Sequence, residues 1–409
     1  MRRRFALVAG LFLAGCGSAT DTADTGSTAA ATSPELAPTS STQPPTTSSL
    51  APAEPLGTEV IPGPPALTLV DGDGTVRWEA APTAGFTTAM QAAVGDGVVV
   101  GVSYCDGPGT VKAWDAGSGH ALWSAVLPNS LGGGVGALIA EHLALVQSAA
   151  GVAAVDSHTG EPRWQAVGRL AYGVGGDTVV TSTLDVDVTS ATSLMGLDLA
   201  TGATRWTAEL PAGQHLDGVA VDDAQAYASA VSPGGPEELV AFALADGAAL
   251  WRAPLVPGSD RSSVEAAAGA AIGWAGDIPG IATAAVDGVS GRERWRADGW
   301  GLPQQQSPSV FVGDGNVYVQ GTQVGDDVGA LDAESGAKRW STSVVSLGGT
   351  NDTIVSAADG GLLVAVDDVV VFLAAADGTP RWRRPSPEVF LGSGDDGIAF
   401  GPECPNLGD

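Results

Sequence analysis

The histidines and the acidic runs are the first places to look for chemistry. The four His are His120, His142, His158 and His215. No spacing among them is typical of a pair of metal ligands. The run Asp71-x-Asp73-Gly74 resembles the start of a calcium loop, but no Glu follows at the required distance, so we interpret it as a turn. No G-x-S-x-G, P-loop or H-E-x-x-H motif is present. The linear sequence therefore predicts no catalytic, metal-binding or cofactor-binding residue.

The first cysteine points to a different chemistry, which is covalent lipid attachment. Three Arg precede an apolar run from Phe5 to Ala14 that is too short to span a bilayer as a stable helix. The run ends in Leu13-Ala14-Gly15-Cys16, which resembles a bacterial lipobox. We predict that residues 1–16 are a lipoprotein signal peptide and that Cys16 is acylated. The alternative is an ordinary signal peptide with an incidental Cys.

A low-complexity segment follows the signal peptide. Between residues 17 and 56, sixteen of forty residues are Ser or Thr, Pro recurs, and Lys, Arg and aromatic residues are absent. Such a segment cannot bury enough apolar surface to fold. We expect a disordered tether that holds a domain of residues 57–409 away from the membrane. The protein would be exported and anchored to the outer face of the cell membrane.

The domain itself is organised around a repeated Trp. The eight copies are Trp78, Trp123, Trp164, Trp206, Trp251, Trp295, Trp340 and Trp382, at intervals of 41 to 45 residues. A Gly lies four residues before each Trp, and Asp, Ser or Thr precedes that Gly. Gly supplies the positive φ of a tight turn, and the short polar side chain bonds the local backbone. The period is typical of a repeat architecture.

Each repeat contains short alternating apolar runs that we interpret as strands. In one interval these runs are Ser309 to Val312, Asn316 to Gln320, and Val328 to Leu331, before the strand that carries Trp340. Four strands in about 44 residues have the size of one propeller blade. The sequence therefore predicts an all-β fold, an eight-bladed propeller of four-stranded blades.

The repeat pattern A-x-D-x-x-T/S-G-x-x-x-W resembles the Trp-docking repeat of the PQQ-like propellers. That family includes the quinoprotein alcohol dehydrogenases and the BamB lipoprotein of outer-membrane assembly. The resemblance implies that each Trp packs against the Gly region of the neighbouring blade. The Asp eight residues before the Trp is replaced by Val70, Ala243 and Ala374 in three copies, where we expect looser turns. The dehydrogenases carry adjacent cysteines over their quinone. No Cys-Cys pair is present here, which argues against PQQ chemistry.

The two ends of the domain complement each other. Residues 66–78 contain a third and a fourth strand, whereas residues 387–401 contain a first and a second strand. Pairing these ends closes the ring. Cys105 and Cys404 then lie three or four residues past equivalent points of neighbouring blades, and the compartment is oxidising. We predict that they form a disulfide; the alternative is two unrelated free thiols.

The charge and the remaining aromatic residues bear on binding. The formal net charge is −28, so nucleic-acid binding is excluded on electrostatic grounds. Long second-to-third-strand loops carry Asp185, Asp187, Glu237 and Glu238, which favour a basic protein or peptide partner; the alternative is a merely solvated acidic surface. Trp114, Trp274 and Trp300 lie outside the docking register and either fill a blade core or stack on a ligand.

These observations favour a monomeric binding or scaffolding module of the cell envelope, without a cofactor, rather than an enzyme. Two alternatives remain open. One is an enzyme whose active site lies at a mouth of the central channel. The other is a BamB-like assembly factor, which would require an outer membrane.

Overall fold

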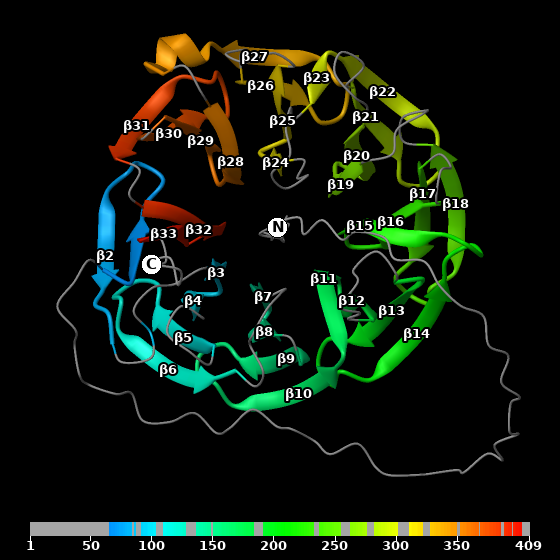
Figure 1. Cartoon of the computed structure of the whole chain (residues 1–409), viewed down its shortest axis with the longest axis horizontal. Coiled ribbons are helices and arrows are strands. Elements are labelled where there is room, and N and C mark those ends of the chain that lie inside the picture. The colour runs from blue at the N-terminus through cyan, green and yellow to red at the C-terminus, as the bar shows by residue number, and fades with distance from the viewer. Residues whose placement is uncertain are drawn as a thin grey trace, which may run out of the picture.

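The structure is a computed structural model in which eight antiparallel sheets form a closed ring around a central axis (Figure 1). It describes residues 65–402 except for 84–85, 87–90, 104–108, 128–135, 149, 184–190, 233–236, 255–261, 276–281, 302–310, 322–327, 350–351, 368, 386–387 and 395. Cys16, Cys105, Cys404, Asp185 and Asp187 lie outside these residues. The predicted eight-bladed propeller is confirmed.

The first four blades follow one another along the chain. Blade 1 contains β3 (Gln91–Gly95), β4 (Val98–Ser103), β5 (Thr110–Asp115) and β6 (Ala121–Val126). Blade 2 contains β7 (Gly136–Ala140), β8 (Leu143–Ser148), β9 (Gly151–Asp156) and β10 (Pro162–Val167). Blade 3 contains β11 (Arg169–Gly175), β12 (Thr178–Thr183), β13 (Ser193–Asp198) and β14 (Thr204–Glu209). Blade 4 contains β15 (His215–Val221), β16 (Gln225–Val231), β17 (Glu237–Ala243) and β18 (Ala249–Pro254).

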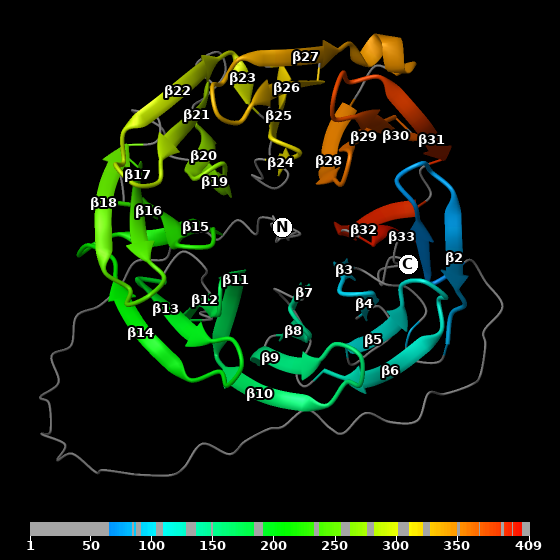
Figure 2. The ribbon, with the colours of Figure 1, turned by 180° about the vertical axis from the view of Figure 1, so that it is seen from behind.

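The remaining blades complete the circle (Figure 2). Blade 5 contains β19 (Ser262–Ala267), β20 (Ala270–Ala275), β21 (Ala282–Asp287) and β22 (Glu293–Asp298). Blade 6 contains β24 (Phe311–Gly313), β25 (Asn316–Gly321), β26 (Val328–Asp332) and β27 (Lys338–Thr342). A short extra strand, β23 (Trp300–Gly301), pairs with β25, and the 3-10 helix η2 (Val344–Leu347) follows β27. Blade 7 contains β28 (Asp352–Ala358), β29 (Gly361–Val366), β30 (Val369–Ala374) and β31 (Pro380–Pro385). Blade 8 contains β32 (Glu388–Gly394), β33 (Gly397–Pro402), β1 (Leu67–Val70) and β2 (Val76–Ala80).

Blade 8 is built from both ends of the domain. Its strand order is β2-β1-β33-β32, and β1 pairs antiparallel with β33. In this pairing Thr68, Leu69 and Val70 lie opposite Phe400, Ala399 and Ile398, respectively. The ring closes as the complementary ends predicted, and this pairing covers sheet edges that would otherwise be open to other chains.

The middle strands are apolar because each blade packs between two others. Every residue of β4 (VVVGVS) is buried, whereas most residues of the outer strand β2 are exposed. Strands buried on both faces have nearly continuous apolar sequences, and β-branched residues suit the pleated surface. The outer strand β2 carries Arg77 and Glu79, which are charged.

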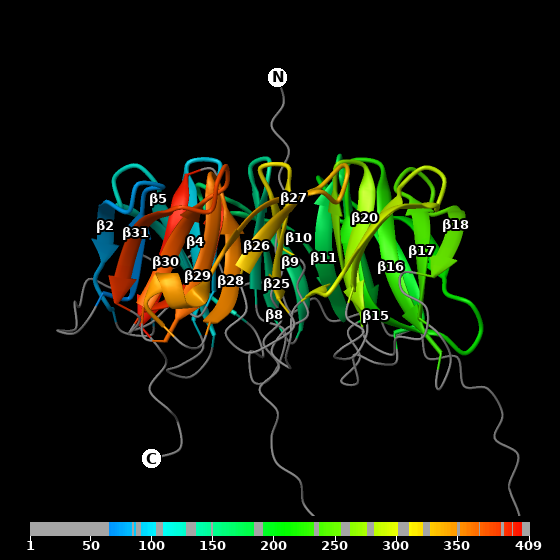
Figure 3. The same cartoon turned by 90° about the horizontal axis from the view of Figure 1, so that it is seen from above.

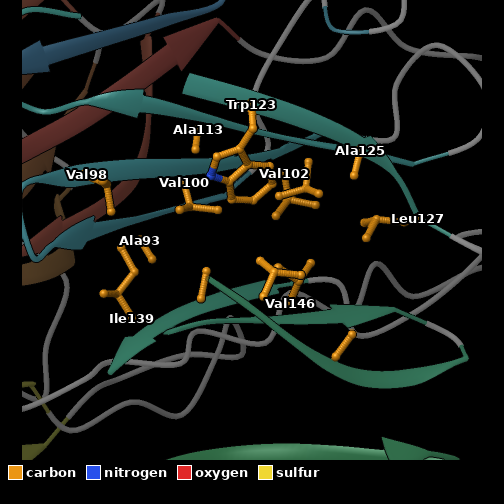
Figure 4. Close-up of a cluster of buried hydrophobic side chains, with 14 residues drawn as sticks. Ala93, Val98, Val100, Val102, Ala113, Trp123, Ala125, Leu127, Ile139 and Val146 are labelled. Carbon is orange, nitrogen blue, oxygen red and sulfur yellow. The ribbon is translucent and has the colours of Figure 1, made fainter. Parts of the chain in front are cut away.

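The core is divided into clusters that lie between neighbouring blades. Figure 4 shows one of them, in which Val100 and Trp123 of blade 1 face Ile139 and Val146 of blade 2. Trp123 is 3 % exposed and Val146 is 1 % exposed. Removing apolar surface from water at each such interface is the main favourable term for holding the ring together.

The antiparallel strand order gives the ring two different faces (Figure 3). The turn face holds the tight turns from first to second strand, such as Asp96-Gly97, and from third to fourth strand, such as 116–119. The opposite face, called the loop face below, is where each second strand leaves for the third and each blade leads to the next. In the part of the chain that the structure describes, no helix is long and apolar enough to cross a membrane.

Candidate functional site

The repeated Trp side chains form a belt of contacts that runs around the whole ring. Each indole Nε1 donates a hydrogen bond to a backbone carbonyl of the following blade, over 2.7 to 3.1 Å. The donors Trp78, Trp123, Trp164, Trp206, Trp251, Trp295, Trp340 and Trp382 pair with the carbonyls of Ala116, Ser157, Leu199, Leu244, Gly288, Ala333, Ala375 and Gly72. The eighth bond joins the last docking Trp to the first turn of the domain.

The Gly of each repeat lies directly under the indole of the preceding blade. A Cβ added to Gly336 would come within 2.6 Å of the Trp295 ring, and the φ of Gly336 is +70°. Only Gly tolerates both the positive φ and this close approach. The same relationship holds for all eight repeats, including Gly74 against Trp382 across the closure.

A carboxylate organises the turn that presents this Gly. Asp332 Oδ1 accepts hydrogen bonds from the Ser335 backbone N–H (2.8 Å) and hydroxyl (2.7 Å), and Oδ2 accepts one from Arg339 Nε (3.1 Å). The Ser335 hydroxyl and the Arg339 guanidinium lower the pKa of Asp332 to about 2. The repeat's Asp, Ser and Arg therefore serve the turn that holds the blades together.

The three copies that lack this Asp replace it locally. Where Val70, Ala243 and Ala374 stand, the residue just before the Gly is Asp. Asp246 Oδ1, for example, accepts the Ala248 N–H at 3.0 Å, and the turn keeps its Gly247 N–H to Ala243 carbonyl bond at 2.9 Å. In the copy at Val70, the Gly74 N–H donates to the Asp71 carbonyl at 2.9 Å instead of to residue 70. The looser turns expected at these three copies stay a prediction.

Two of the four His converge on the turn face. Asp96 Oδ2, from blade 1, lies 3.0 Å from His142 Nδ1 and 3.2 Å from Ser157 Oγ of blade 2, and 3.7 Å from His158 Nδ1. The Asp96 hydrogen bond raises the pKa of His142. Ser157 is fully buried, so its Oγ is out of a substrate's reach, and Asp96 competes with His158 for that hydroxyl. The cluster links two blades and lacks the accessible nucleophile of a Ser-His-Asp triad.

Two ionisable side chains have pKa values shifted by burial. Lys112 of β5 is buried, and Glu265 of β19 is half-buried. Lys112 Nζ donates to Thr83 Oγ1 at 3.2 Å and lies 5.7 Å from the Trp114 ring centroid, and burial lowers its pKa. Burial raises the pKa of Glu265, on the inner strand β19 opposite Ile272, to about 8. Among the described residues, no group of three His, Cys, Asp or Glu is arranged to hold a metal ion.

The aromatic residues outside the docking register have packing roles where they are described. Trp114 is 3 % exposed and packs edge-on against Phe86, with ring centroids 5.3 Å apart. Trp300 forms part of β23, and its ring fills the space above Gly329. The side chain of Trp274 lies outside the described part.

Of the predicted partner-binding residues, the structure describes only Glu238 and the backbone of Glu237, at the loop-face end of β17. The backbone of Glu237 and the whole of Glu238 belong to β17. Glu238 is half-buried, and its Oε2 accepts a hydrogen bond from Gln214 Nε2 at 3.1 Å. Nothing in the repeat pattern marks the connection between blades 3 and 4 that carries Gln214, so the sequence does not predict this contact.

The closed belt of Trp and Gly contacts is accompanied by a sequence match to a known family. Residues 65–269, 191–372 and 280–397 match the family described as outer membrane protein assembly factor BamB. The chain belongs to this family. The overlapping matches follow from the repeats, because a window of several blades can be placed at more than one position along the ring. No curated protein matches the sequence significantly.

Solved structures share the fold of this BamB family member at low sequence identity. BamB from Moraxella catarrhalis is 17 % identical, with a TM-score of 0.53, over 83 % of this chain and 98 % of that one. A quinohemoprotein alcohol dehydrogenase from Pseudomonas putida is 13 % identical, with a TM-score of 0.51, over 83 % of this chain and 71 % of that one. Dihydro-heme d1 dehydrogenase NirN is 15 % identical, with a TM-score of 0.52, over 80 % and 76 %. Because both binding proteins and enzymes have this fold, function must be argued from the faces of the ring.

Proposed function

We propose that this BamB family member is a lipid-anchored binding or scaffolding module on the extracytoplasmic side of a bacterial envelope. The lipobox ending in Cys16 and the Ser/Thr/Pro-rich tether of residues 17–56 support export and anchoring. Family membership supports a role in which the propeller contacts other proteins. The propeller would act as a monomer, since its ring is already closed by its own strands.

The observation that carries the proposal is that the repeated residues hold the blades together and so have a structural role. All eight Trp and the Gly beneath them are committed to blade docking, and the Asp, Ser or Thr before each Gly belongs to the turn that presents it. This arrangement builds a rigid platform, and rigid scaffolds position binding residues on the loops that they carry. The loop face then offers Glu238 and its neighbours to a partner, and an acidic surface favours a basic one.

Two other readings differ in what they require. An assembly factor of the BamB type needs an outer membrane, whereas the tether is typical of a lipoprotein on a high-GC Gram-positive surface. An enzyme would need to bind a small molecule at the mouth of the central channel. Two of the solved structures with a similar fold are dehydrogenases, so this alternative is tested as well. A small molecule that co-purifies with the protein and is retained in its native mass spectrum would favour the enzyme.

Site-specific photo-cross-linking in the native envelope tests the proposal. A photoreactive residue at Glu209, on the loop-face end of β14, should give a discrete protein adduct, and one at Asp177, on the turn face, should not. Replacing Asp185, Asp187, Glu237 and Glu238 by Asn or Gln should weaken the adduct and flatten its salt dependence. Equal adducts from both faces, or none from either, would contradict the proposed role.

A further inference from the structure

In blades 1 and 2, a two-residue turn joins the first and second strands on the turn face. The turn is Asp96-Gly97 in blade 1 and Glu141-His142 in blade 2. His142 is therefore the second turn residue of blade 2, as Gly97 is of blade 1. The chemistry of this position differs between the two blades. Gly97 offers only its backbone, whereas His142 adds an imidazole that takes up a proton near neutral pH.

At two other interfaces, the second turn residue donates its backbone N–H to an Asp of the preceding blade. The Gly97 N–H donates to Asp396 Oδ2 of blade 8 at 2.8 Å. The Gly360 N–H of blade 7 donates to Asp314 Oδ2 of blade 6 at 2.9 Å. A backbone N–H is a permanent donor, so proton uptake does not change its role in these contacts.

Between blades 1 and 2, the same position contributes a side chain instead. His142 Nδ1 lies 3.0 Å from Asp96 Oδ2, and His158 Nδ1 lies 3.7 Å from the same oxygen. The buried Ser157 hydroxyl lies 3.2 Å from Asp96 Oδ2 and 3.0 Å from His158 Nδ1. A blade 1 carboxylate is thus shared by three side chains of blade 2.

Proton uptake changes how these groups share their hydrogen bonds. When neutral His158 carries its proton at Nε2, its Nδ1 and Asp96 compete for the single Ser157 proton. A protonated imidazole has a proton on both nitrogens, so His158 then donates to Ser157 Oγ and leaves the hydroxyl proton to Asp96. His142 becomes a charged donor to the same carboxylate, and charge-assisted hydrogen bonds are about twice as strong as neutral ones.

The charges closest to His142 favour its protonated form. The hydrogen bond to Asp96 is the main cause that raises the pKa of His142, and the negative charges of Glu141 and Asp156 raise it further. The nearby cation, Arg163 of β10, is paired with Asp156 at 2.8 Å. Its charge is therefore balanced within blade 2.

The carboxylates of the neighbouring elements have other donors. Asp396 of blade 8 accepts the Gly97 N–H, and Asp115, at the end of β5, accepts the Ser118 N–H and hydroxyl. His120 follows in the same turn as Ser118 and is exposed. It provides a matched His on the same face for comparison.

We propose that a proton-operated latch joins blades 1 and 2 on the turn face, formed by Asp96, His142, Ser157 and His158. The latch is tight at mildly acidic pH, where the imidazoles are charged beside the carboxylate, and it loosens at mildly alkaline pH. Because the pKa of His142 is raised, its contribution is fully present below the ordinary value of about 6.5 and is lost as the pH rises through the folded value. The inference goes beyond the proposed binding role and requires no partner.

An NMR titration of the four His rings in the full chain tests the coupling directly. His142→Gln identifies the His142 signal. We expect His142 to titrate above the ordinary value of about 6.5, and Asp96→Asn to bring its pKa back toward that value. His120 should titrate identically in both proteins. An unchanged His142 titration in Asp96→Asn would overturn the proposal.

Hydrogen exchange tests whether the interface responds to the proton. Protection factors, which correct for the intrinsic effect of pH on exchange, should fall by about two- to fivefold between pH 6 and pH 8 in residues 95–98 and 140–143, the range expected for exposed charge pairs. Residues 313–316 and 358–361, whose contact uses a backbone N–H, should keep constant protection.

Variants separate the latch from a general effect of pH. Replacing both His142 and His158 by Gln keeps side-chain N–H donors that cannot titrate, so the pH dependence should disappear. His120→Gln should retain the parent's response. Constant protection at residues 95–98 and 140–143 in the parent, an equal fall at residues 313–316, or a response that survives the double replacement would each overturn the latch.

Discussion

The indole Nε1 of Trp382 donates a hydrogen bond to the carbonyl oxygen of Gly72 over 3.1 Å, although 310 residues separate them. Trp382 belongs to blade 7, and Gly72 belongs to the part of blade 8 that comes from the start of the domain. This contact, where the two ends of the domain meet, has the same geometry as the Trp contacts between all the other neighbouring blades. Two kinds of contact therefore close the ring. They are the pairing of β1 with β33 and the docking of Trp382 on blade 8.

Truncating a docking Trp should destabilise the ring. Trp206 is 6 % exposed, and its ring lies against Gly247 of blade 4. Trp206→Ala removes a large buried side chain and should lower the free energy of unfolding by about 3 to 5 kcal/mol. Chemical denaturation measures this loss. Full stability of the variant would disprove the docking role.

The Asp332 turn should contribute stability that is lost in acid. The folded pKa of Asp332 is about 2, below the ordinary value of about 3.9 for an unfolded chain. A lowered pKa stabilises the fold above the unfolded value, and the contribution disappears as the pH falls from about 4 through about 2. Melting temperature measured against pH should thus show a shallower acid limb for Asp332→Asn. Glu334→Gln, in the same turn, is the control and should keep the parent's slope.

Glu265 should have the opposite dependence. Burial raises its pKa to about 8, so the folded state favours the protonated form. That contribution is present below the unfolded value near 4.3 and is lost as the pH rises through about 8. Glu265→Gln mimics the protonated form and should melt higher than the parent at pH 8 to 9, with little difference at pH 4. Identical melting curves at both pH values would show that the carboxyl is solvated.

The lipid anchor can be tested at Cys16. The basic head, the short apolar run and Leu13-Ala14-Gly15-Cys16 predict acylation of this thiol. Cells given labelled palmitate should incorporate the label into the parent protein and not into Cys16→Ala. The variant should be released from the membrane or remain unprocessed; equal membrane retention would contradict the prediction.

A disulfide between Cys105 and Cys404 should strengthen the closure of the ring. In the sequence, Cys105 comes two residues after the end of β4 and Cys404 two residues after the end of β33. These two strands belong to the neighbouring blades 1 and 8. Closing a loop of nearly 300 residues is worth about 5 kcal/mol as an upper figure from chain entropy. Peptide mapping without reduction should find the linked pair. Alkylation of both thiols before any reductant is added would rule out the bond.

The sequence by itself determined the elements that repeat. A Trp every 41 to 45 residues, with Gly four residues before it, is a local pattern that encodes a turn and an anchor eight times. The two incomplete blades at the ends of the domain could be predicted because their strand and turn patterns are also local in the sequence. Even the replacement of one turn Asp by another, as at Asp246, is a local exchange that can be seen without coordinates.

Tertiary structure alone decided which side chains far apart in the sequence meet. Gln214 and Glu238 are 24 residues apart on different elements, and neither belongs to the repeat, so no periodicity predicts their contact. The meeting of Asp96 with His142 and His158 depends likewise on the rotation from blade 1 to blade 2. A repeat specifies the spacing along the chain, whereas the closure of the ring fixes the distances between blades. These distances decide whether a polar atom finds a hydrogen-bond partner.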